Sequence, residues 1–142
     1  MMGLQYREIW EGAYRGVAFE VAHWKLGWNY YLIIPQAQLP DDVRRAFNLR
    51  SISFRMSPGG NEHIRYDYAS APIISDLNWH GGLTWYEKER DQRGKVVGYR
   101  LGCDYLHYFD EGQDHSLASV MTDATRSIDK LWELVPNIKL RC

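Results

Sequence analysis

The sequence has few cysteines and no long apolar run, and each lack excludes a class of protein. Cys103 and Cys142 are the only cysteines among 142 residues, too few for a disulfide framework. No apolar stretch approaches the ~20 residues that a membrane-spanning helix needs. Arg7, Glu8 and Glu11 interrupt the beginning of the chain, so we expect no signal peptide and a cytoplasmic location.

Strong charge and the common catalytic motifs are missing as well. The net charge of -1 gives no concentrated basic surface, so we expect neither direct binding of nucleic acid nor a membrane partner. The chain has no nucleophile elbow, phosphate-binding loop, zinc-protease motif or Cys-x-x-Cys pair. Whether the protein is an enzyme, and which residues would be catalytic, therefore stays open.

Aromatic residues are abundant. They make up 14% of the chain, with six Trp and ten Tyr. These side chains combine a large contact area with a polar tip, so they suit both cores and binding surfaces. Hydrophobic content of 45% and charge of 25% are ordinary for a folded protein, and we expect a single domain over residues 1–142.

Alternating apolar and polar residues predict several strands, because alternation is typical of half-buried strands. Alternation predicts strands over residues 14–24 and 52–56. A turn at residues 25–27 and Pro35 predict a partner strand over residues 28–34, and residues 63–68 could add another short strand. Residues 1–13 fit either a short helix or an extended segment. Pro40, Asp41 and Asp42 predict the first turn of a short helix that ends near Asn48.

A long helix is predicted near the C-terminus. The apolar residues that recur there at helical spacing are Leu117, Val120, Met121, Ala124, Ile128, Leu131 and Val135. Ser116 suits the N-cap, and Pro136 ends the helix. The predicted fold is α+β: an antiparallel β-sheet with one long C-terminal helix packed on one face.

A hairpin is predicted from residues 83–88 and 95–103, because residues 91–94 between them are turn formers. With Gln92 at the centre of the turn, the facing pairs are His80 and Asp104, Gly82 and Gly102, Thr84 and Arg100, and Tyr86 and Gly98. All of these share one face. The opposite face is expected to be buried and carries Leu83, Trp85, Val97, Tyr99, Leu101 and Cys103.

The polar face of this hairpin is the candidate site. His80 and Asp104 face each other, and a turn after Leu106 could bring His107 and Asp110 towards them. Two imidazoles and two carboxylates suit a divalent cation such as zinc, manganese or iron. The same residues suit acid–base chemistry, or a structural role in which both histidines bond local backbone.

Glycines and an arginine extend the candidate site. Gly82 facing Gly102 would leave a shallow trough for a ligand, and Arg100 could bind a phosphate or a carboxylate. Cys103 is interpreted as an inert core thiol. The candidate ligand-binding residues are His80, Gly81, Gly82, Thr84, Arg100, Asp104, His107 and Asp110, with no resident cofactor required.

At these residues the chain resembles a family of small uncharacterised proteins common in bacteriophage and prophage genomes. The matching segments, within residues 28–35 and 79–132, are Ile34-Pro35, His80-Gly81-Gly82-Leu83-Thr84-Trp85, Gly102-x-Asp104-x-x-His107-x-x-Asp110 and Ile128-Asp129. After Pro35 the family often has a His-Pro step, where this chain has Gln38-Leu39-Pro40. The resemblance implies a phage accessory protein in the cytoplasm of a host bacterium. It favours His80, Asp104, His107 and Asp110 as site residues and supplies no reaction.

Three functions fit these features. The first is a phage counter-defence protein that binds a small nucleotide-like ligand in an aromatic, glycine-lined pocket. The second is a small metal-dependent or His/Asp hydrolase. The third is an inhibitor that binds a host defence protein, such as an anti-CRISPR factor, through an exposed aromatic surface. We favour the first, because the aromatic content, the glycines and Arg100 all suit it. Homo-oligomerisation is left open.

Overall fold

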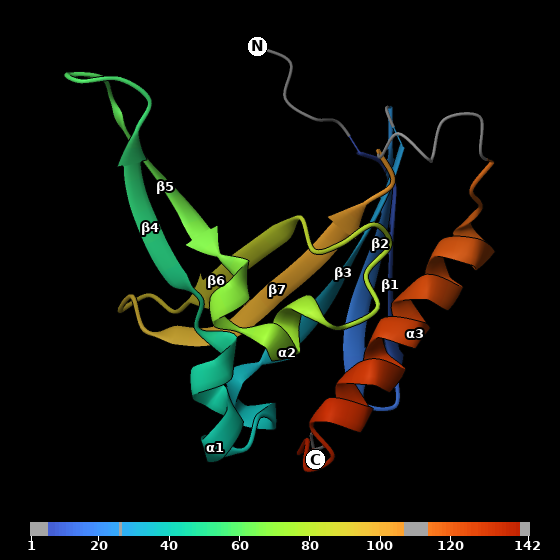
Figure 1. Cartoon of the computed structure of the whole chain (residues 1–142). Helices are drawn as coiled ribbons and strands as arrows, with labels where there is room; N and C mark the ends of the chain where they lie inside the picture. Colours follow the sequence, from blue (N-terminus) through green and yellow to red (C-terminus); the bar gives the residue numbers. More distant parts are fainter. Residues whose placement is uncertain (1–5, 26, 107–113, 140–142) are drawn as a thin grey trace.

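A five-stranded antiparallel sheet forms the centre of the protein. The computed structural model describes residues 6–25, 27–106 and 114–139 (Figure 1). The strands of this sheet, in spatial order, are β1 (Tyr6–Tyr14), β2 (Val17–Trp24), β3 (Gly27–Pro35), β7 (Val96–Asp104) and β6 (Trp85–Arg90). A separate hairpin consists of β4 (Arg50–Arg55) and β5 (Glu62–Asp67).

Short helices join these strands, and one long helix follows them. The short elements are η1 (Gln36–Gln38), α1 (Asp41–Arg44), η2 (Arg45–Phe47), η3 (Tyr68–Ser70) and α2 (Pro72–Ser75), and the long helix is α3 (Leu117–Leu134). In Figure 1, α3 lies across one face of the main sheet. None of the helices in the described part of the chain is long and apolar enough to cross a membrane.

Helix α3 begins and ends as predicted. The backbone N–H of Ser119 donates to Ser116 Oγ at 3.1 Å, and the N–H of Ser116 donates to Ser119 Oγ at 2.9 Å, which together form a capping box. Its buried residues are Val120, Ala124, Ser127, Ile128 and Leu131. The α+β class, with one long helix on an antiparallel sheet, is thus confirmed.

The first predicted strand is in fact parts of two strands. Arg15 and Gly16 have φ angles of 50° and 79°, and this turn separates β1 from β2 within the predicted range 14–24. Residues 6–14 form a strand, which agrees with the extended alternative that was predicted for residues 1–13. Val17, Phe19 and Val21 are buried on the face covered by α3.

The predicted register of the β6–β7 hairpin is wrong. Gly102 was predicted to lie opposite Gly82, but it lies opposite Trp85, so the pairing is shifted by three residues along β6. Because side chains alternate along a strand, an odd shift exchanges the faces of β6. Tyr86 is therefore buried, and Trp85, expected in the core, is 47% exposed.

The turn explains this shift. Asp91 Oδ1 accepts hydrogen bonds from the N–H groups of Arg93 and Lys95, and the pairing is irregular between Glu89 and Arg90. A bulge adds a residue to one strand and so changes the register. The faces of β7 are as predicted for Tyr99, Leu101 and Cys103, which are buried, whereas Val97 is exposed.

Candidate functional site

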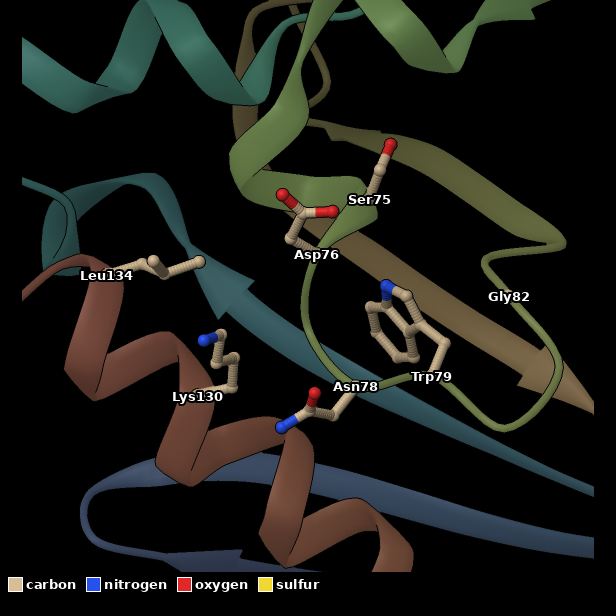
Figure 2. A pocket seen from close by; sticks show the side chains of 7 residues that line it. All are labelled: Ser75, Asp76, Asn78, Trp79, Gly82, Lys130 and Leu134. Carbon is tan, nitrogen blue, oxygen red and sulfur yellow. The ribbon is translucent and has the colours of Figure 1, made fainter.

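A pocket of about 420 Å³ lies between the segment that follows α2 and the C-terminal half of α3 (Figure 2). Its volume is within the range of small-molecule sites. The residues that line it are Ser75, Asp76, Asn78, Trp79, Gly82, Lys130 and Leu134. Gly82 belongs to the predicted site, and the pocket therefore adjoins the His80-Gly81-Gly82 segment.

Left-handed backbone shapes the loop side of the pocket. Asn78, Gly81 and Gly82 have φ angles of 54°, 72° and 105°. Asparagine is among the few residues other than glycine that tolerate such angles. A Cβ at Gly82 would meet no atom within 4 Å, so the backbone conformation rather than space requires glycine there. Of these three residues only Asn78 is not a glycine, and a non-glycine residue in the left-handed region is often found at binding sites.

Trp79 is a fixed wall of the pocket. Its side chain is 8% exposed, and its indole N–H donates to the carbonyl oxygen of Ile74 at 2.7 Å. The indole stacks on the ring of Tyr30, with centroids 5.7 Å apart. The Tyr30 hydroxyl in turn lies 2.8 Å from Ser127 Oγ on α3. These contacts connect the loop, β3 and α3 and hold the wall in place.

Opposite charges border the pocket from different elements. The Lys130 ammonium comes from α3 and the Asp76 carboxylate from the loop after α2, as Figure 2 shows. Lys130 Nζ lies 3.2 Å from Glu133 Oε1, and its side chain is 27% exposed. The ammonium can bind an anionic group, and Asp76 and Asn78 can bind hydroxyl or amino groups of the same ligand.

The predicted site residue His80 lies in an aromatic cluster. Its ring stacks on Tyr105, with centroids 3.9 Å apart, and His115 contacts both rings edge-on. The Tyr105 hydroxyl donates to Asp123 Oδ2 at 2.5 Å. Burial, followed by this hydrogen bond, raises the pKa of Tyr105. The phenol therefore stays protonated and acts as a donor.

The structure does not bring all the predicted residues together. Asp104 ends β7 and accepts a hydrogen bond from the N–H of Leu106, and Thr84 is exposed. Arg100 lies on the opposite face of the sheet from His80. There it pairs with Glu20 at 2.5 Å and lies over the ring of Tyr31, with the guanidinium 4.3 Å from the ring centroid. The expectation that Arg100 shares a face with His80 is wrong.

His107 and Asp110 lie outside the described residues, so their predicted convergence on His80 and Asp104 stays a prediction. Within residues 6–25, 27–106 and 114–139, no group of three or more His, Cys, Asp or Glu side chains could hold a metal ion. Burial raises the pKa of the Cys103 thiol to about 12, in agreement with an inert core thiol.

Sequence reasoning missed Asp76, Asn78, His115 and Lys130. Residues 69–78 lack a clear period, and Lys130 is not among the apolar residues from which the long helix was predicted. One signal was available: the polar turn formers Ser75, Asp76 and Asn78 directly precede Trp79. Nothing in the sequence links that loop to Lys130, which comes from a distant segment.

Comparisons with known proteins add no relative from which a function could be transferred. No family model matches this chain, and no curated protein or solved structure matches it.

Proposed function

We propose that the protein binds a small nucleotide-like ligand in the pocket between the 75–82 loop and α3. The observation that carries the proposal is that Lys130 and Asp76 border the same pocket from different elements, beside the wall made by Trp79. A nucleotide carries a phosphate at one end and hydroxyl and amino donors along its length. This distribution of groups matches a pocket with one ammonium and one carboxylate.

Each side chain has a distinct role in this proposal. The Lys130 ammonium binds the phosphate as a point charge. Asp76 accepts hydrogen bonds from ribose hydroxyls or from an exocyclic amine. Leu134 and the exposed edge of Trp79 contact the apolar parts of the ligand. Trp79 is already held by Ile74 and Tyr30, so its ordering on binding costs little entropy.

The biological role stays a prediction. The resemblance to phage proteins favours a counter-defence protein that sequesters a nucleotide signal in the host cytoplasm. The hydrolase alternative depends on His107 and Asp110, which lie outside the described residues.

Thermal melting in the presence of ribonucleotides tests the proposal. The panel contains adenosine and guanosine 5′-monophosphates, the triphosphates and cyclic mono- and dinucleotides, with the parent nucleosides as controls. A ligand that binds only the native state raises the melting temperature. At least one nucleotide should raise it more than its nucleoside does, because only the nucleotide has a phosphate for Lys130 to bind. No shift with any nucleotide at millimolar concentration would contradict the proposal.

A further inference from the structure

The β4–β5 hairpin leaves a strand edge open. Among the described residues, β4 pairs only with β5. All six residues of β4 are exposed, and in Figure 1 the hairpin reaches away from the main sheet with β4 on its outer side. Natural proteins protect such an edge with lysine, proline or a bulge. The central residues of β4, from Ser51 to Phe54, contain none of these.

We propose that β4 pairs antiparallel with β4 of a second copy of the chain, joining the two hairpins into a four-stranded sheet. The strand is self-complementary about Ser53. With Ser53 opposite Ser53 of the second copy, Ile52 faces Phe54 and Ser51 faces Arg55. A two-fold axis beside Ser53 repeats each pair, as in an isologous dimer.

The exposed apolar side chains support this register. Ile52 is 38% exposed and Phe54 is 37% exposed, and both lie on the same face of the hairpin. In the dimer the two copies of Ile52 and Phe54 form one contiguous apolar block across the central strand pair. Apolar cross-strand pairs of this kind stabilise antiparallel sheets. Behind them, the Phe54 ring packs on His63 of β5, with centroids 5.5 Å apart.

The charges of β4 are compatible with this register. Arg50 pairs with Asp67 and Arg55 lies 4.0 Å from Glu62, so each has an acidic partner within its own hairpin. In the proposed register each arginine faces an uncharged residue, because Arg50 faces Met56 and Arg55 faces Ser51. A slip of one residue would place Arg50 opposite Arg55, and like charges directly opposite are destabilising.

The contact is small, so we expect a weak dimer. A standard stable interface buries about 800 Å² on each partner, and a six-residue strand pair buries less. The pairing should therefore be concentration-dependent, with a dissociation constant in the micromolar range or above. The nucleotide pocket lies elsewhere, on α3 and the loop after α2, so dimerisation and ligand binding are separable.

Sedimentation of Ser53 charge variants tests the pairing. Ser53→Asp and Ser53→Lys each place like charges opposite one another, so each variant alone should remain monomeric where the wild type dimerises. An equimolar mixture should recover a dimer, because the two charges then attract. Ser51→Asp is the matched control: it places a carboxylate opposite Arg55 and should leave the dimer intact or tighten it.

Because the β4–β5 hairpin lies outside the main sheet, these substitutions should leave the main sheet folded. Far-UV circular dichroism of each variant verifies this. The proposal fails if the wild type stays monomeric up to millimolar concentration. It also fails if Ser53→Asp and Ser53→Lys dimerise as the wild type does, or if their mixture stays monomeric. If Ser53→Asp does not fold, then Ser53→Lys and Ser51→Asp alone still decide the register.

Discussion

Trp79 stacks on Tyr30 with the two ring centroids 5.7 Å apart, and this contact joins the candidate pocket to the core of the protein. Tyr30 is fully buried, and its hydroxyl lies 2.8 Å from Ser127 Oγ on α3. The pocket wall and the core are therefore one packed unit.

The first prediction concerns the buried hydrogen bond between Tyr30 and Ser127. Tyr30→Phe should lower the free energy of unfolding by ~1–3 kcal/mol, because it leaves the Ser127 hydroxyl buried without this partner. Adding Ser127→Ala to Tyr30→Phe should cost little more, since both polar groups are then gone. Urea denaturation of the single and double variants measures the coupling; strictly additive losses would show that the two hydroxyls do not interact.

The second prediction concerns backbone conformation at the pocket. Gly82→Ala should destabilise the protein by ~1–3 kcal/mol, because φ at residue 82 is 105° and alanine avoids such angles. Asn78→Gly should leave stability nearly unchanged or raise it, since glycine adopts the φ of 54° freely. Chemical denaturation measures the free energy of unfolding of both variants. An unchanged free energy of unfolding in Gly82→Ala would contradict the positive φ angle at residue 82.

The third prediction concerns the buried face of α3. Ile128→Asp should unfold the protein or make it insoluble, because Ile128 is fully buried and the carboxylate would have no partner. Arg126→Ala should change stability by less than ~1 kcal/mol, since Arg126 is exposed and its contact with Asp123 is a surface ion pair. Similar melting losses for the two variants would mean that the helix faces are misassigned.

The fourth prediction is alkaline unfolding. Burial raises the pKa of Tyr30, Tyr86 and Tyr105 above the ordinary value of about 10. Above pH ~10 the unfolded chain loses these protons while the folded protein keeps them, so stability is fully present below that pH and falls as pH rises. Melts between pH 8 and 11 should show a loss that is shallower in Tyr105→Phe than in the wild type. An equal slope in both proteins would contradict a raised pKa at Tyr105.

The fold was predictable where the hydrophobic period is clear. Alternation from Val17 to Val21 predicted the strand that is now β2, and the helical spacing from Val120 to Leu131 predicted α3, because burial on one face imposes those periods. The β6–β7 register was not predictable in the same way. It depends on the hydrogen bonds of Asp91 and on the irregularity at Glu89, which alternation does not encode.

The candidate site was predictable only in part. Gly82 was predicted as a site residue and does line the pocket, but the predicted trough between Gly82 and Gly102 is wrong because Gly102 lies opposite Trp85. The charged groups of the pocket were not predictable, because Lys130 lines the same pocket as Asp76 and Asn78 only through the packing of α3 on the sheet. The predicted shared face of Arg100 and His80 was wrong because β6 begins only at Trp85, so the paired strands do not extend back to His80.

The ion pair of Lys130 with Glu133 gives a fifth prediction. Glu133→Gln removes the carboxylate that lies 3.2 Å from the ammonium, so nucleotide affinity should rise by up to about fivefold, the equivalent of one exposed ion pair. Stability should change by less than ~1 kcal/mol. Titration calorimetry at low salt measures the affinity, and weaker binding by Glu133→Gln would argue against a phosphate at Lys130.

Titration calorimetry of Lys130→Gln with the nucleotide that stabilises the wild type most tests the central claim most directly. Arg126→Gln is the matched control, because it removes one positive charge from the same helix but lies outside the pocket lining. The account predicts that Lys130→Gln loses at least tenfold in affinity while Arg126→Gln binds as the wild type does. Equal affinity for the wild type and Lys130→Gln would contradict the proposed pocket.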